Sequence, residues 1–67
     1  MLEAPRDLST RDQKLNRVIE CTEFIRSYAV SAREAAWRGD EEGLETDLRA
    51  ARVALMEAIK QFKEIKP

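Results

Sequence analysis

The sequence predicts an all-α fold: an antiparallel hairpin of two long helices that forms a single domain over residues 1–67. The first observation is composition, since strong helix formers (Ala, Leu, Glu, Arg, Lys and Gln) dominate the chain. The second is the position of the helix breakers. The prolines stand at the ends, as Pro5 and Pro67, and the glycines stand in the middle, as Gly39 and Gly43. The third is the recurrence of apolar residues at helical spacing on both sides of these glycines. A short link between two long helices makes them antiparallel neighbours.

The first helix is expected over about residues 10–38. Thr10 with Gln13 has the pattern of a capping box, and Ser9 with Asp12 is the alternative start. The apolar seam of this helix has 3-4 spacing and becomes small toward the glycines, so we expect the two helices to close tightly there. Its members are Leu15, Val18, Thr22, Ile25, Ala29, Ala32 and Ala36.

The second helix is expected over about residues 41–65, after a turn at 39–40. Gly39 suits the left-handed position that ends a helix, and Asp40 suits the N-cap of the next one. If the loop extended to Gly43, this helix would begin near Leu44. Its seam has an unbroken 4-3 spacing, which is one heptad stripe. Its members are Leu44, Leu48, Ala51, Leu55, Ala58, Phe62 and Ile65. We expect the two seams together to form the hairpin core.

The hairpin has more apolar surface than two helices can bury against each other. Large side chains lie outside both seams, and each one left in water forgoes about 1.5–3 kcal/mol of burial free energy. These candidate partner-binding residues are Ile19, Phe24, Tyr28, Trp37, Met56 and Ile59. Contiguous exposed apolar surface marks an interaction site. We therefore expect the hairpin to complete a helical bundle with a protein partner or with a second copy of itself.

Residues suited to catalysis or to metal binding are scarce. The chain has one cysteine, Cys21, and no histidine, so no nucleophile has a histidine base and the commonest zinc-site patterns are absent. The carboxylates after the turn, between Asp40 and Asp47, lack the calcium-loop spacing. No glycine-rich phosphate loop occurs. We expect neither an enzyme nor a bound cofactor or metal.

Charge and hydropathy indicate where the protein acts and whether it binds nucleic acid. The net charge is −1, and the longest apolar run is Val53 to Met56, far too short to span a membrane. The N-terminus has no apolar core of a signal peptide, so we expect a cytoplasmic protein. Basic residues gather at the open end of the hairpin, but acidic residues interrupt them, and nucleic acid is therefore not an expected partner. These basic residues are Arg6, Arg11, Lys14, Arg17, Lys60, Lys63 and Lys66.

The turn and the second helix carry a resemblance. Arg38-Gly39, then Leu48, Ala54-Leu55 and Ala58-Ile59, make the chain resemble the small type III secretion needle-chaperone family (YscE/PscE-like) over roughly a third of its length. The resemblance implies a helical hairpin, a cytosolic and non-catalytic role, and pairing with a second chaperone built of tetratricopeptide-like helices. Together the two would keep a needle subunit soluble before export.

A second hypothesis is a small regulator of phage or plasmid type. In this case two copies would form a homodimeric four-helix bundle, with RNA binding of the ROP type as one version. Both hypotheses explain the large apolar side chains outside the two seams, and the sequence does not decide between them.

Overall fold

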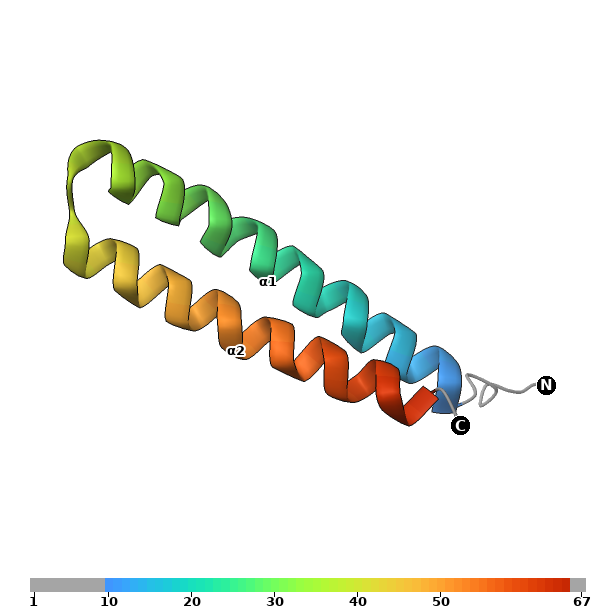
Figure 1. Cartoon of the computed structure of the whole chain (residues 1–67). Helices are drawn as coiled ribbons and strands as arrows, with labels where there is room; N and C mark the ends of the chain where they lie inside the picture. Colours follow the sequence, from blue (N-terminus) through green and yellow to red (C-terminus); the bar gives the residue numbers. More distant parts are fainter. Residues whose placement is uncertain (1–9, 66–67) are drawn as a thin grey trace.

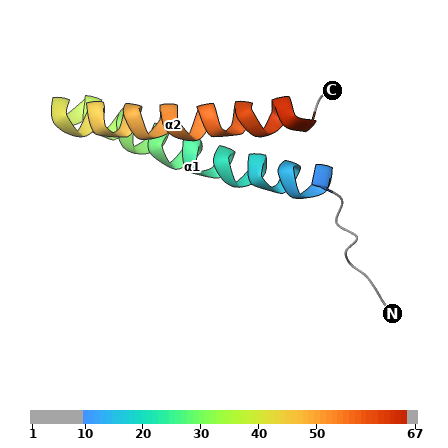
Figure 2. The same ribbon diagram turned by 90° about the horizontal axis from the view of Figure 1, so that it is seen from below.

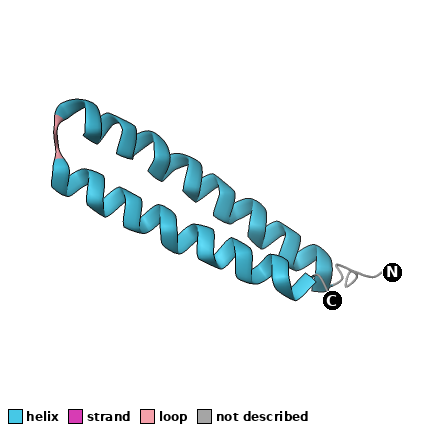
Figure 3. Cartoon of the chain, in the orientation of Figure 1, coloured by secondary structure: helices cyan, strands magenta, loops and turns pink. Residues whose placement is uncertain are grey.

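The computed structural model of the chain describes residues 10–65, which form two antiparallel α-helices (Figure 1, Figure 3). Helix α1 spans Thr10–Arg38, helix α2 spans Glu41–Ile65, and Gly39 and Asp40 link them. The predicted fold class, a helical hairpin, is confirmed, and both helices have the expected bounds. Thr10 is already helical, and Ser9 lies outside the described residues. Figure 2 shows that the helix axes cross at an angle rather than run strictly parallel.

The turn is closed by backbone hydrogen bonds and a side-chain cap. Gly39 adopts the left-handed conformation, with φ at 73°. Its N–H donates to the Ala36 carbonyl at 3.1 Å, and the Asp40 N–H donates to the Ala35 carbonyl at 2.8 Å, which together form a Schellman motif. Asp40 then caps α2, because its carboxylate accepts the Gly43 N–H at 2.9 Å. Helix α2 therefore begins before Gly43, and the alternative start near Leu44 is wrong.

The contact between the helices is lined by small side chains. The buried apolar residues of the described part are Cys21, Ala32, Ala35 and Ala58, of which Ala35 is only 1% exposed. Three of these lie on α1, and two of those are near the turn. Alanine brings the helix backbones close together, so the expected tight closure at the turn end agrees with the structure.

The predicted core seam is only partly buried. Leu48, Leu55 and Phe62 remain 54%, 49% and 53% exposed, and Ala29 is exposed as well. These four assignments to the core are therefore wrong. Thr22 and Ala36 of the first seam are exposed as well, and Ala32 and Ala58 are buried. The remaining seam residues are half-buried: Leu15, Val18, Ile25, Leu44, Ala51 and Ile65.

The helices touch along lines displaced from the predicted seams. On α1 the buried and half-buried residues follow the line Val18, Cys21, Ile25, Tyr28, Ala32 and Ala35. On α2 they follow the line Leu44, Asp47, Ala51, Ala54, Ala58, Gln61 and Ile65. Leu48, Leu55 and Phe62 each come one residue after a member of the second line, so they project about 100° further round α2.

The displacement has a physical reason. In a four-helix bundle the apolar stripe of each helix faces the bundle axis, which lies between the directions of its two neighbours. In a lone hairpin each helix has one neighbour, so the centre of the stripe stays at the edge of the contact. The heptad seam therefore predicts the centre of the apolar stripe rather than the line of contact in a lone hairpin.

Candidate protein-interaction surface

The two long sides of the hairpin differ in chemistry. Residues one position before a contact-line residue in the sequence lie on one side of the hairpin, in both α1 and α2. Residues one position after a contact-line residue lie on the other side. The two helices agree in this because they are antiparallel. The first, which we call the ionic side, carries Lys14, Arg17 and Ser31 of α1 with Asp47, Glu57 and Glu64 of α2. The second, which we call the open apolar face, carries Leu15 and Ala29 of α1 with Leu48, Leu55 and Phe62 of α2, beside Val18, Ile25 and Leu44 of the contact lines.

Three polar contacts cross between the helices on the ionic side. The Ser31 hydroxyl donates to the Asp47 carboxylate at 2.6 Å, Arg17 lies 3.8 Å from Glu57, and Lys14 pairs with Glu64. These contacts fix the axial register of α1 against α2. By this register Leu15 is level with Phe62, Thr22 with Leu55, and Ala29 with Leu48.

The charged groups on the ionic side shift one another's proton affinity. The hydrogen bond from Lys14 lowers the pKa of the Glu64 carboxyl, and the Lys14 and Lys60 charges act in the same direction. The hydrogen bond to Glu20 raises the pKa of the Arg17 guanidinium further above its already high ordinary value. Contacts between the helices on this side are therefore largely ionic.

The open apolar face has a different character. Its largest side chains come from α2 and are about half exposed, whereas the α1 part decreases in size from Leu15 to Ala29 toward the turn. The polar residue in this part of α1, Thr22, donates its hydroxyl to the Ile19 carbonyl at 2.7 Å, so its own helix satisfies it. The face is therefore apolar along its length, and the Thr22 hydroxyl within it already has a hydrogen-bond partner.

The candidate partner-binding residues do not form one patch. Five of the six are exposed, with Trp37 the most at 79%, whereas Tyr28 is half-buried on the α1 contact line. Ile59 borders the open apolar face, and Phe24 lies on the ionic side. Ile19 follows Val18 as Ile59 follows Ala58 and borders the same face, whereas Met56 and Trp37 lie away from both contact lines. The hairpin thus distributes these six residues around its circumference, while residues assigned to the core make the contiguous apolar surface.

Two aromatic contacts stabilise exposed rings locally. The Phe24 and Tyr28 rings stack with centroids 6.4 Å apart. The Arg33 guanidinium lies 5.3 Å from the centroid of the Trp37 ring, a cation–π contact of the kind that residues four apart on a helix can make. Trp37 nevertheless remains open to a partner at the turn end of the hairpin.

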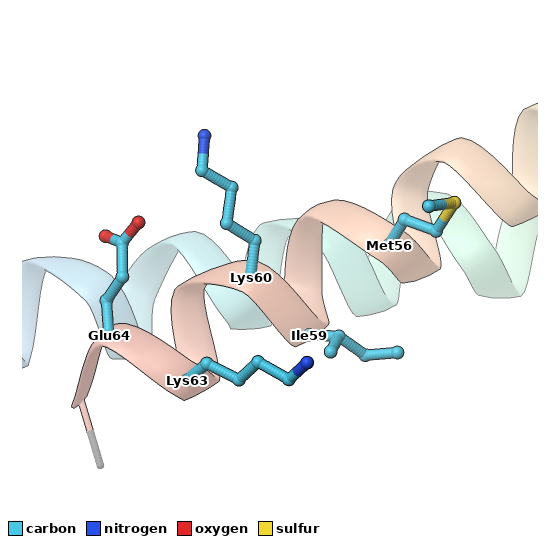
Figure 4. Close-up of a pocket in the computed structure, with 5 residues that line it drawn as sticks. All are labelled: Met56, Ile59, Lys60, Lys63 and Glu64. Carbon is cyan, nitrogen blue, oxygen red and sulfur yellow. The ribbon is translucent and has the colours of Figure 1, made fainter. Parts of the chain in front are cut away.

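Two hollows in the surface of the described helices differ in the elements that line them. One is lined by Met56, Ile59, Lys60, Lys63 and Glu64, all from α2, so it lies between neighbouring side chains of a single helix (Figure 4). In Figure 4 Lys63 extends along the helix toward Ile59, whereas Lys60 and Glu64 point away from that side. Another is lined by residues of both helices, including Arg17, Cys21, Phe24 and Val53 on the ionic side. Glu57 also lines the second hollow, and among the described residues no hydrogen bond joins its carboxylate to the Cys21 thiol.

The basic end of the hairpin is partly neutralised within the chain. Lys14 pairs with Glu64, and Arg17 lies near both Glu20 and Glu57. Lys60 and Lys63 remain as cations beside the open end, and Arg6 and Lys66 lie outside the described residues. Phosphate binding would have to compete with these internal carboxylates.

The described part of the chain, residues 10–65, has no candidate metal site and no candidate membrane span. Within this range no three His, Cys, Asp or Glu side chains gather in a way that could hold a metal ion. Neither of the two described helices combines the length and the apolar content needed to cross a membrane.

A comparison of the chain with protein-family models, with curated proteins and with solved structures finds no match. The resemblance to the needle-chaperone family therefore rests on the turn and second-helix residues themselves.

Proposed function

We propose that the chain is a non-catalytic protein-interaction module that acts in the cytoplasm as a type III secretion co-chaperone. It would pair with a helical-repeat chaperone and help to keep a needle subunit soluble. The open apolar face is the observation that supports an interaction role, since Leu48, Leu55 and Phe62 stay about half exposed on one side of the hairpin. The secretion role is supported by the resemblance around Arg38-Gly39 and Ala54-Leu55.

The face has the properties of a helix-docking surface. Its large side chains occur at heptad spacing, which matches the ridges and grooves of another helix. A few buried anchors usually dominate the energy of such a contact. We expect Leu55, near the middle of α2, to be the principal anchor and Leu48 and Phe62 to flank it.

Affinity capture from the source cell tests this function. The wild-type chain is expected to capture a tetratricopeptide-like protein together with a small needle-like subunit, and Leu55→Glu is expected to lose both. Val53→Glu is the matched control, because Val53 is a similarly exposed apolar residue of α2 on the ionic side. Circular dichroism on the same samples confirms that both variants stay helical. Recovery of nucleic acid instead, or equal loss of the partner in both variants, would contradict the proposal.

A further inference from the structure

The large side chains of the open apolar face are about half exposed in the single hairpin, and a second copy of the chain can bury them. We propose that, without another partner, a second copy covers this face in an antiparallel arrangement, with the turn end of one hairpin over the open end of the other. The product is a four-helix bundle in which α2 packs on α2 of the second copy and α1 on α1. This inference does not depend on the secretion role.

The area of the face is sufficient for a stable dimer. The 25 residues of α2 make a rod of about 37 Å, and two helices side by side are about 20 Å wide. A face of these dimensions covers about 700 Å² per copy, or about 1,400 Å² for the pair, which lies within the range of specific protein interfaces.

Side-chain size favours the antiparallel orientation. At the open end the face carries a large pair, Leu15 level with Phe62, and toward the turn it carries a smaller pair, Ala29 level with Leu48. In an antiparallel dimer the large pair of one copy meets the smaller pair of the other, and the layer of Thr22 and Leu55 meets itself at the two-fold axis. A parallel dimer would crowd the open end and leave space at the turn end, and interiors tolerate neither well.

Charge favours the same orientation. At the turn end, Glu41 and Glu45 line a hollow together with Leu44 and Leu48 of the face. At the open end, Lys60 and Lys63 line the hollow that contains Ile59. The antiparallel dimer places Glu45, which also pairs with Arg49 of its own helix at 2.7 Å, near Lys63 of the second copy.

The parallel dimer has poorer charge complementarity. It would place α2 over α1 of the second copy, and the register would then bring Arg52 near Arg26, a pair of like charges. Glu45 would lie near Arg33 there instead of Lys63. Like charges brought together across an interface disfavour an arrangement.

Sedimentation of the purified wild-type chain is the first test. A dimer is expected at tens of micromolar, and Leu55→Glu is expected to raise its dissociation constant by at least about tenfold, since the introduced charge would be desolvated at the two-fold axis. Val53→Glu should sediment like the wild type. A wild-type monomer at this concentration, or an equal effect of the two variants, would overturn the proposal.

Cross-linking tests the orientation. In a Cys21→Ala background, Glu45→Cys and Lys63→Cys chains are mixed and treated with a short bismaleimide. The antiparallel dimer gives the mixed 45–63 product, because the two positions lie at the same level. In a parallel dimer they would be about 27 Å apart along the bundle. A 45–45 product without the mixed one would overturn the orientation.

The two proposals fail in different ways. A wild-type monomer that still captures the helical-repeat partner would overturn the dimer and leave the proposed function standing. A wild-type dimer that Leu55→Glu breaks, but that captures neither a helical-repeat protein nor a needle-like subunit, would do the reverse.

Discussion

The Asp40 carboxylate accepts a hydrogen bond from the Gly43 N–H at 2.9 Å, and a Cβ atom at residue 43 would collide with that same carboxylate. Gly43 lies inside α2, where glycine ordinarily costs about 1 kcal/mol relative to alanine. The glycine thus lowers helix propensity but leaves room for the cap that begins the helix.

This relationship predicts a strong coupling between the two residues. Gly43→Ala alone should lower or leave unchanged the free energy of unfolding, because the collision weakens a cap that contributes about 0.5–2 kcal/mol. In an Asp40→Ala background the same Gly43→Ala change should stabilise by about 1 kcal/mol, because only the helix propensity then matters. Thermal unfolding followed by circular dichroism, at one fixed protein concentration, measures all four chains of the cycle. Additive effects would show that the cap and the glycine are independent.

Gly39 should respond differently to the same substitution. No atom lies within 4 Å of a Cβ built at this position, so space does not restrict it, but its φ of 73° does. Gly39→Ala is therefore expected to destabilise the hairpin by about 1–2 kcal/mol through left-handed strain, and Gly39→Asn by less. The unfolding midpoint in urea checks the order wild type, Asn, Ala. An alanine variant as stable as the wild type would contradict the role of the Schellman turn.

Local rules predicted the turn and the helix bounds from the sequence. Gly39 and Asp40 have short-range roles that depend only on neighbouring backbone groups, and the structure bears both out. The heptad pattern also located the apolar stripe of α2 correctly. The pattern does not determine which edge of a stripe the neighbouring helix covers.

The edge that the neighbouring helix covers decides which residues are buried and which form the interaction surface. The contact edge depends on how closely the two helices approach, and buried Cys21, Ala32 and Ala35 on α1 form the close contact. Tyr28, expected outside the seams, therefore belongs to the contact line together with Cys21 and Ala35, and Leu48 and Leu55 become surface. The alternation of large and small residues in α2 was the available signal, since its alanines alone fit the narrow contact.

The narrow contact should be sensitive to added volume. Ala32 is 5% exposed in the contact, so Ala32→Leu is expected to force the helices apart and to cost about 1–3 kcal/mol in the free energy of unfolding. Ala36→Leu is the matched control, because Ala36 is exposed beside an open hollow four residues further along the same helix. Urea unfolding followed by circular dichroism distinguishes the two variants. Equal stability of both would show that the contact line at Ala32 is wrong.

The Lys14–Glu64 pair should make stability depend on pH in the acidic range. Because the pKa of Glu64 is lowered in the folded chain, the folded state binds this proton less tightly than the unfolded state does. The contribution is present above the unfolded value for glutamate, about 4.3, and is lost as the pH falls through the lower folded value. Its size is small because both groups are accessible to solvent.

Melting temperatures between pH 7 and pH 2.5 measure this effect. The wild type should lose more stability over this range than Glu64→Gln or Lys14→Gln, and added salt should reduce the difference. Glu23→Gln is the control, since the exposed Glu23 carboxylate has no ion-pair partner in residues 10–65. Parallel pH curves for the wild type and Glu64→Gln would refute the role of this pair.

The Cys21 thiol should report the opening of the hairpin. It is 2% exposed on the α1 contact line, so a thiol reagent reaches it only when the helices separate. A domain of this size rarely exceeds 3–5 kcal/mol in stability, which corresponds to labelling about 150- to 4,000-fold slower than in the unfolded chain. If a second copy covers the open apolar face, association adds to this stability, and labelling should slow further as protein concentration rises. Leu55→Glu should remove the concentration dependence, whereas Val53→Glu should keep it. Labelling as fast as in urea would mean that the two helices do not stay closed on their own, and protection independent of concentration in the wild type would mean that association does not stabilise the hairpin.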